Sequence, residues 1–185
     1  MKFPLFLIVG VMAALGAQAQ QPVGPGAVKI VKILPSVVKT PEYQVTGTAA
    51  KRSKSLDWLE VEVEFESKAE EIPELTFKYT IMVEKRLLEG EVTHVSIPKG
   101  REHYSVMYVA PRSLEKLTGG KPLTGASIEN AWVVVSYQGQ VLDQQAFRPS
   151  AIPNLQHLSG MVLNKMETPF SPLYFDRYEA IKSTK

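Results

Sequence analysis

The stretch "LDWLEVEVEFES" (residues 56–67) carries the clearest secondary-structure signal in this chain. Four apolar residues alternate there with four glutamates over eight positions. Successive side chains of a β-strand point to opposite faces, so the alternation predicts a strand with one dry face and one wet face. The dry face holds Leu59, Val61, Val63 and Phe65, and the wet face holds Glu60, Glu62, Glu64 and Glu66.

The glutamate row has two interpretations. Without an Asp/Asn/Gly loop to add oxygen ligands, it does not indicate a calcium site. We therefore interpret it as a solvated face, whose charges pair across strands with Lys78 and its neighbours and discourage aggregation.

A second run, "ELTFKYTIMVEK" (residues 74–85), repeats the alternation, and "EIPE" (71–74) separates it from the first. We predict that the two runs pair as antiparallel neighbours. Further strands are expected in "AVKIVKIL" (27–34), "EYQVTGTA" (42–49), "EVTHVSIP" (91–98) and "EHYSVMYVAP" (102–111).

The segment "PRSLEKLTGG" (111–120) has a proline to begin a short helix and two glycines to end it. Residues 127–147 then give two strands joined at Gln138–Gly139, where glycine permits a tight hairpin. A count of about seven short strands over residues 28–148 predicts an all-β fold, an immunoglobulin-like antiparallel β-sandwich, with a small barrel as the alternative.

The amino terminus reads as a cleavable secretory signal over residues 1–19, with the cut after Ala19. A Pro/Gly linker follows over residues 20–27. No later stretch is apolar enough to span a bilayer, so we expect an exported protein in the periplasm or at the cell surface, with no transmembrane anchor after signal cleavage.

The composition excludes several classes of protein. The chain has no cysteine, so neither a disulfide scaffold nor an acylated cysteine anchor is available. Its 21 Lys+Arg against 19 Asp+Glu lack the net basic footprint of a nucleic-acid-binding protein. The one basic cluster, Lys51, Arg52 and Lys54, is interpreted as a solvated loop.

No residue pattern predicts an enzyme. The chain lacks a Gly-x-Ser-x-Gly turn, and no nucleophile, base and orienting group converge in the sequence. His94 and His103 lie in consecutive predicted strands, and a hairpin can bring them together, but no carboxylate pattern accompanies them. We predict no catalytic residue, no metal site and no cofactor.

Residues 149–185 form a Pro-rich and aromatic C-terminal tail, in which Ser171 and Pro172 predict the start of a short amphipathic helix. So many large apolar side chains do not remain in water. The tail either folds over the sheet face that carries Trp132 and Val134, or it docks on another subunit or partner. The hypothetical partner-binding residues are Phe170, Leu173, Tyr174, Phe175, Tyr178 and Trp132.

Exposed aromatic rings also allow a different function. Trp58 and the pair Tyr104 and Tyr108, which share a face of one strand, can form a platform for stacking sugars. The alternative hypothesis is therefore a glycan-binding adhesion module.

The segments "WLEVEVEFES" (58–67), "ELTFKYTIMV" (74–83) and "LNKMETPFSPLYFDRYEAIK" (163–182) resemble those of small exported Verrucomicrobia proteins, including immunoglobulin-like proteins associated with type IV pilus assembly. The resemblance spans most of the chain after the signal and carries no reaction motif and no transferable binding residue. It implies a non-enzymatic β-sandwich that makes protein contacts, with a protein of a pilus-like or cell-envelope assembly or by self-association.

Overall fold

The computed structural model describes residues 23–43, 55–124, 127–174 and 176–183. The predicted signal peptide, the first residues of the linker, the Lys51/Arg52/Lys54 cluster, Phe175 and most of the strand expected at 42–49 lie outside the described residues. The strands are β1 (Val28–Lys39), β2 (Asp57–Val83), β3 (Arg86–Val109), β4 (Ile128–Tyr137), β5 (Gln140–Ala146), β6 (His157–Ser159) and β7 (Val162–Asn164), and the helices are α1 (Pro111–Thr118) and the 3-10 turn η2 (Lys165–Glu167).

The two alternating runs are not paired with each other, so that prediction is wrong. They are successive halves of the long strand β2, and both halves pair with β3: residues 59–65 with 103–109, and residues 72–83 with 86–97. The register shifts lie between Phe65 and Glu71, and the segment "EIPE" itself continues the pairing with β3 without reversing the chain. The chain reverses at Glu84 and Lys85, whose φ angles of 48° and 56° suit a two-residue hairpin.

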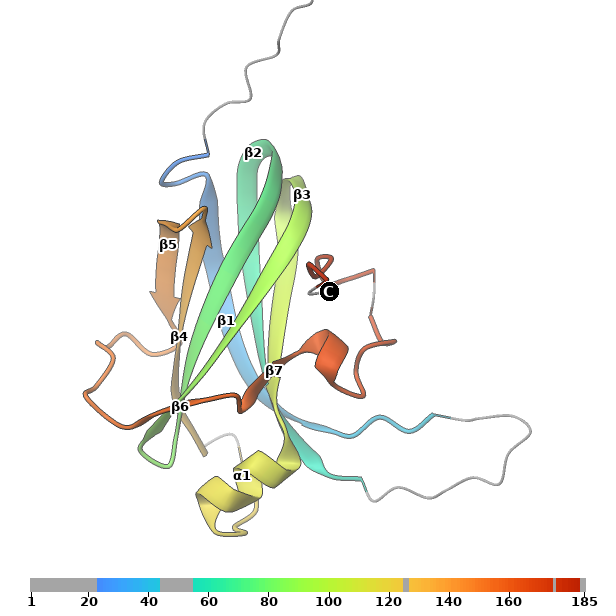
Figure 1. The fold of residues 1–185 in the computed structure, drawn as a ribbon, viewed down its shortest axis with the longest axis vertical. Helices are drawn as coiled ribbons and strands as arrows, with labels where there is room; N and C mark the ends of the chain where they lie inside the picture. The colour runs from blue at the N-terminus through green and yellow to red at the C-terminus, as the bar shows by residue number, and fades with distance from the viewer. Residues whose placement is uncertain (1–22, 44–54, 125–126, 175, 184–185) are drawn as a thin grey trace, which may run out of the picture.

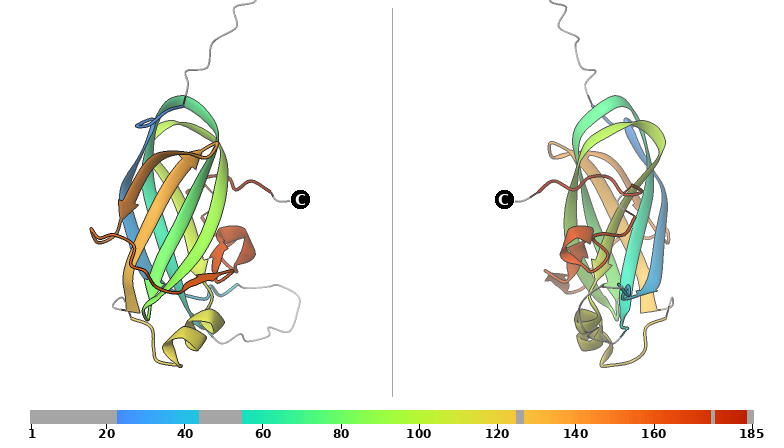
Figure 2. Two further views of the ribbon diagram at one scale, coloured as in Figure 1. Left: turned by 60° about the vertical axis from the view of Figure 1, so that its left-hand side comes forward. Right: turned by 90° about the vertical axis from the view of Figure 1, so that its right-hand side faces the viewer.

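Both long strands bend over at one end of the molecule, so their halves lie in two facing layers (Figures 1 and 2). β1 and β7 extend the layer that contains the first half of β2, while β4, β5 and β6 belong with the second half. All pairs are antiparallel except β3 with β6. The predicted all-β, immunoglobulin-like sandwich is confirmed.

The core lies between these layers. It contains the apolar face of residues 59–65 that the sequence predicted to be buried. Leu59, Val61, Val63 and Phe65 are at most 1% exposed, and they join Phe77 and other residues from the second layer in one cluster. The seam between the edge strands β1 and β5 is linked by the backbone N–H of Ile30, which donates to Asp143 Oδ2 at 2.7 Å.

Two local predictions are also confirmed. Helix α1 has a proline in its first turn and ends at Gly119, whose φ of 64° is left-handed. The hairpin between β4 and β5 turns at Gln138 and Gly139, which both have positive φ. Among the described residues, no helix has the length and apolarity to cross a membrane.

The face that carries Trp132 is not covered by the aromatic tail. Trp132 is 7% exposed, and its indole N–H donates to the carbonyl of Ser150 at 2.7 Å. Asn130 holds the same segment by donating to the carbonyl of Arg148 and to Ser150 Oγ. The loop directly after β5 therefore covers Trp132, because these hydrogen bonds hold it next to the indole ring.

Close packing between β3 and β7 gives the first prediction. A Cβ on Gly90 would lie 2.5 Å from Val162 Cβ and 2.9 Å from Met107 Cε. We expect Gly90→Ala to lower the free energy of unfolding by about 1–3 kcal/mol in urea titrations, because overpacking strains the strands. Gly24→Ala, where no atom lies within 4 Å of the added Cβ, is the matched control.

Adding Val162→Ala to Gly90→Ala removes Val162 Cγ1, which would lie 2.7 Å from the added Cβ, and so relieves part of the clash. The double variant should therefore lose less stability than the sum of the single variants. Strict additivity would contradict the packing of β7 on β3.

Candidate functional site

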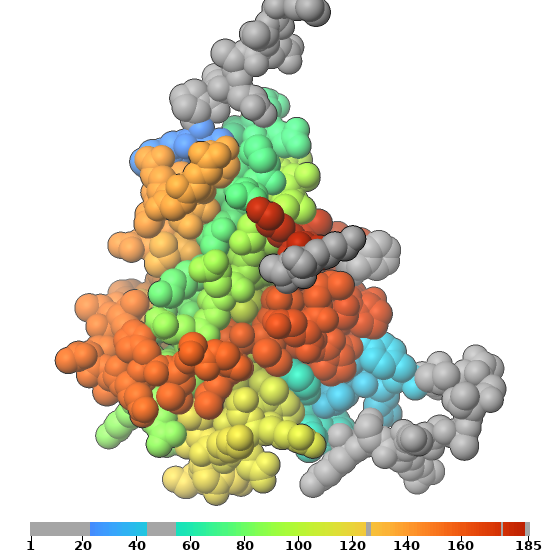
Figure 3. Space-filling model, in the orientation of Figure 1, coloured from blue at the N-terminus to red at the C-terminus, as the bar shows by residue number. Residues whose placement is uncertain are grey.

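The chain after β5 runs along the outside of the sandwich as a continuous band (Figures 2 and 3). β6 pairs with β3 at residues 87–89, and β7 pairs with β3 at residues 107–109. Near the carboxyl end, the backbone N–H groups of Glu179 and Lys182 donate to the carbonyls of Tyr104 and Thr93, at 3.1 and 2.8 Å. The tail is therefore joined to both halves of β3 by backbone hydrogen bonds.

The helix predicted from Ser171 is not formed. The helical turn of the tail is η2, closed by a capping box between Asn164 and Glu167, and the described residues from 170 to 178 form successive turns. Tyr174 has a left-handed φ of 51°, which no right-handed helix accommodates. This conformation lets the chain turn back toward β2, and tertiary contacts outweigh the local helix signal.

One aromatic ring of the tail is part of the fold. Phe170 is 5% exposed, and it stacks on Tyr108 with 4.6 Å between ring centroids and meets Trp58 edge-on at 5.5 Å. Phe170, Trp58, Tyr108 and Val106 form a second, smaller core on the outer side of the sheet. The tail therefore covers its own domain, on the glutamate face of β2 instead of the Trp132 face.

Glu62 fixes the position of the tail on this face. Arg177 donates to both carboxylate oxygens at 2.8 and 3.1 Å, and the Tyr178 hydroxyl donates to Oε2 at 2.8 Å. Burial alone would raise the pKa of Glu62, but these hydrogen bonds and the guanidinium charge outweigh it and hold the pKa below 4.5. The carboxylate stays ionised under the tail.

The wet face is consequently only partly solvated, which corrects the sequence interpretation. Glu62 is 9% exposed, and Glu60 is half-buried beside it. Lys78 does not pair with this row, since it lies in the other half of β2 and its Nζ is 3.5 Å from Glu89 Oε1.

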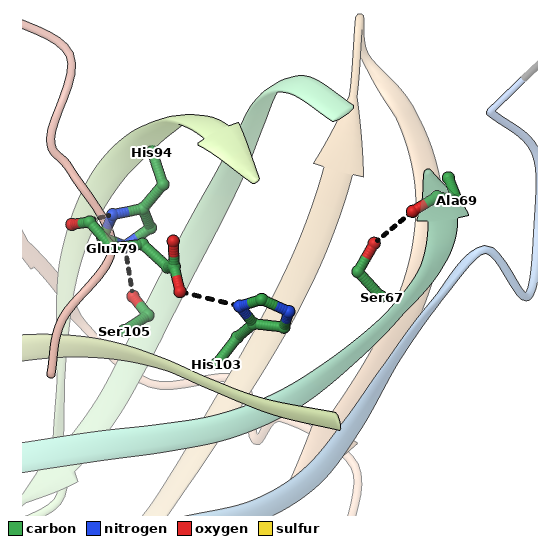
Figure 4. Close-up of polar contacts among 6 residues, drawn as sticks. All are labelled: Ser67, Ala69, His94, His103, Ser105 and Glu179. Carbon is green, nitrogen blue, oxygen red and sulfur yellow. Dashed lines mark hydrogen bonds and ion pairs between the residues drawn. The ribbon is translucent and has the colours of Figure 1, made fainter. Parts of the chain in front are cut away.

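The two histidines flank Glu179 (Figure 4). His94 is 1% exposed, and its Nδ1 lies 3.0 Å from the carbonyl oxygen of Glu179. A carbonyl only accepts, so Nδ1 carries the proton. Nε2 then accepts from Ser105 Oγ at 2.7 Å, and Ser105 in turn accepts from the Tyr79 hydroxyl.

His103 holds the side chain of the same glutamate. Its Nδ1 lies 2.7 Å from Glu179 Oε1, and its Nε2 is buried with no partner among the described residues. Gly100 leaves room for this nitrogen, because a Cβ there would lie 2.6 Å from it. In the described part of the chain, no group of His, Asp or Glu is arranged to hold a metal ion.

The residues assigned to glycan binding do not form an exposed platform. Trp58 and Tyr108 are 9% and 1% exposed beneath Phe170. Tyr104 is half-buried, and the guanidinium of Arg177 lies 3.8 Å above its ring. The tail occupies the surface on which a sugar would stack.

The tail and the sheet enclose a groove of about 580 Å³ on the same face. The end of β1 and the outer face of β2 form one side, and the turns of the tail form the other. Its lining residues are Val38, Lys39, Pro41, Glu60, Glu62, Phe170, Leu173, Tyr174, Arg177 and Tyr178.

The hypothetical partner-binding residues thus divide into two groups. Phe170 and Trp132 are buried in their own fold, whereas Leu173 and Tyr178 are half-buried in the groove wall and Tyr174 is 63% exposed at its rim. Sequence reasoning missed Arg177, Glu62 and Glu179. The sequence does not indicate that Arg177 and Glu62 form an ion pair, because they are 115 residues apart along the chain.

The second core gives a testable prediction. In a Trp132→Phe background, Trp58 is the only tryptophan, so its emission reports on the contact with Phe170. Phe170→Ala should lower the free energy of unfolding by about 3–5 kcal/mol and shift the emission to the red. Tyr174→Ala, at the exposed rim, should change the stability by less than about 0.5 kcal/mol; equal effects would contradict this assignment.

The buried His94 predicts a pH dependence of stability. Burial lowers the pKa of His94 from 6.5 to about 4, despite the hydrogen bonds to backbone carbonyls. Between these values the unfolded chain binds a proton that the folded protein does not, so stability falls as the pH falls from 6.5 toward 4.

We expect the titration of His94 to lower the free energy of unfolding by about 2 kcal/mol between pH 6.5 and pH 5. His94→Gln, which does not titrate, should show a correspondingly flatter profile in urea titrations. Glu62, whose pKa is also lowered, acts at lower pH and is common to both proteins. Parallel profiles for the two proteins would contradict a neutral, buried His94.

Comparison with known proteins agrees with the fold. A protein-family model matches residues 18–185. A crystal structure of a protein from Akkermansia muciniphila, one of the Verrucomicrobia, is 26% identical, with a TM-score of 0.75 over 85% of this chain and 94% of that chain. No curated protein matches the chain. The chain therefore belongs to the family that the matching model describes, and the predicted kinship with Verrucomicrobia proteins is confirmed.

Proposed function

We propose that this protein is an exported, non-enzymatic module that makes protein–protein contacts in a pilus-like or cell-envelope assembly. The observation that carries the proposal is the groove between the tail and the sheet, with the exposed ring of Tyr174 at its rim. Exposed aromatic side chains next to a concave, partly apolar surface are typical of binding sites.

Neighbouring apolar side chains enlarge this surface. Met166 is 63% exposed and Tyr43 is 47% exposed. The Tyr43 hydroxyl donates to the carbonyl of Pro169, and Ser171 Oγ lies 3.5 Å from Met166 Sδ, so both belong to the region around the tail. We define Tyr43, Met166, Leu173 and Tyr174 as the tail surface.

The buried position of the polar residues supports a role without catalysis. Ser105 and His94 form a Ser–His hydrogen bond, but they are 0% and 1% exposed and lie inside the sandwich beneath the tail. A substrate cannot reach this pair without partial unfolding. The pair instead completes a hydrogen-bonded chain that holds the tail at Glu179.

Export is part of the same proposal. The amino-terminal signal pattern and the resemblance to exported Verrucomicrobia proteins favour the periplasm or the cell surface. Similarity to an Akkermansia muciniphila protein over most of both chains is consistent with this origin. The glycan-binding alternative loses its main support, because Trp58 and Tyr108 are covered by Phe170.

Site-specific photo-crosslinking in the cells that produce the protein tests the proposal. A photoreactive phenylalanine at position 174 should yield a defined crosslinked envelope protein, identified by mass spectrometry. The same residue at Gln145, exposed on β5, should not yield it. Identical products at both positions, or none at position 174, would count against a docking role for the tail surface.

A further inference from the structure

Glu60 is the one carboxylate of the groove that has no cationic partner among the described residues. Arg177 is engaged by Glu62 through two hydrogen bonds, and Lys39 is paired with Asp57, with 2.6 Å between Nζ and Oδ1. Glu60 instead accepts a hydrogen bond from Ser36 Oγ at 3.1 Å. The paired charges cancel, so the described residues leave the groove with one uncompensated negative charge.

Glu60 has a neutral hydroxyl neighbour on its buried side, and its other side faces the open groove. Burial and, next, the charge of Glu60 raise the pKa of Tyr108, so this hydroxyl remains protonated near the carboxylate. On the open side, Val38 and Leu173 are apolar, and the ring of Tyr174 stands at the rim. A half-buried carboxylate with apolar and aromatic neighbours favours an amphipathic cation.

Lysine and arginine side chains have this chemistry. Their aliphatic stems pack on apolar side chains, while the charged head pairs with a carboxylate or lies over an aromatic ring. A groove of about 580 Å³ accepts such a side chain with its neighbouring residues.

We propose that the groove recognises a basic side chain, lysine or arginine, that a protein partner presents between apolar residues. The head pairs with Glu60, and the stem lies between Val38 and the tail at Leu173 and Tyr174. This inference rests on the proposed function, since it names the partner chemistry of the same surface.

The test uses the whole chain after the signal and short peptide probes, with binding followed by NMR titration up to millimolar concentrations. Acetyl-Leu-Arg-Leu-amide is the probe. In two matched peptides, citrulline replaces arginine with a neutral side chain of the same shape, and glutamate reverses the charge. We expect the arginine peptide to bind at least about tenfold more tightly than either.

Glu60→Gln should abolish this preference for arginine, because the amide keeps the shape and can still accept from Ser36 but has no charge. Glu66→Gln removes the same charge from the same face of β2, outside the groove, and should leave the preference unchanged. NMR spectra of each variant also show that the fold is intact.

Three outcomes overturn the inference: no binding of the arginine peptide, equal binding of all three peptides, or a preference that survives Glu60→Gln. A variant with Lys51, Arg52 and Lys54 all replaced by alanine tests a competing occupant from the same chain. A tenfold gain in peptide affinity there would mean that this chain fills its own groove, and would also overturn the proposal. Crosslinking from position 174 remains the separate test of the proposed function, and it can succeed where the peptides fail.

Discussion

The buried carboxylate of Glu62 fixes the C-terminal tail on the outer face of the sheet. A charge that is removed from water needs an opposite charge and hydrogen bonds for both oxygens, or its burial is strongly unfavourable. Arg177 and Tyr178 meet this need from the tail, with three hydrogen bonds between 2.8 and 3.1 Å. The tail is therefore held at a defined position instead of forming a loose apolar cover.

This constraint explains why one segment both covers the sheet and lines a groove. Phe170 is inserted between Trp58 and Tyr108, and Glu179 is held by His94 and His103, so both ends of the segment are fixed. The turns between these anchors form one wall of the groove. A self-covering tail and the proposed docking surface are thus compatible, because the residues buried in the fold differ from those exposed at the groove.

The sequence predicted those features that depend on local pattern. Alternation identified the buried face at Leu59, Val61 and Val63, and glycine positions identified the end of α1 and the hairpin at Gly139. Pairing between strands is non-local, so the same alternation did not reveal that residues 56–67 and 74–85 belong to one bent strand. The helix expected at Ser171 failed because contacts with Glu62 and Trp58 determine the path of the tail. The candidate site was predicted only as a set of aromatic residues with Leu173, because Glu60 and Glu62 come from a distant part of the sequence and join the site only when the chain folds.

Hydrogen exchange of individual backbone amides distinguishes a tail that is an integral part of the folded domain from one that is loosely attached. The amides of Val95, Glu179 and Lys182 donate to the carbonyls of Ala180, Tyr104 and Thr93 across the contact between β3 and the tail. We expect them to exchange slowly, within about tenfold of neighbouring amides in β3, because both sets open in the same cooperative unit. Exchange of Glu179 and Lys182 at the rate of an unfolded peptide, while the β2–β3 ladder stays protected, would contradict the account.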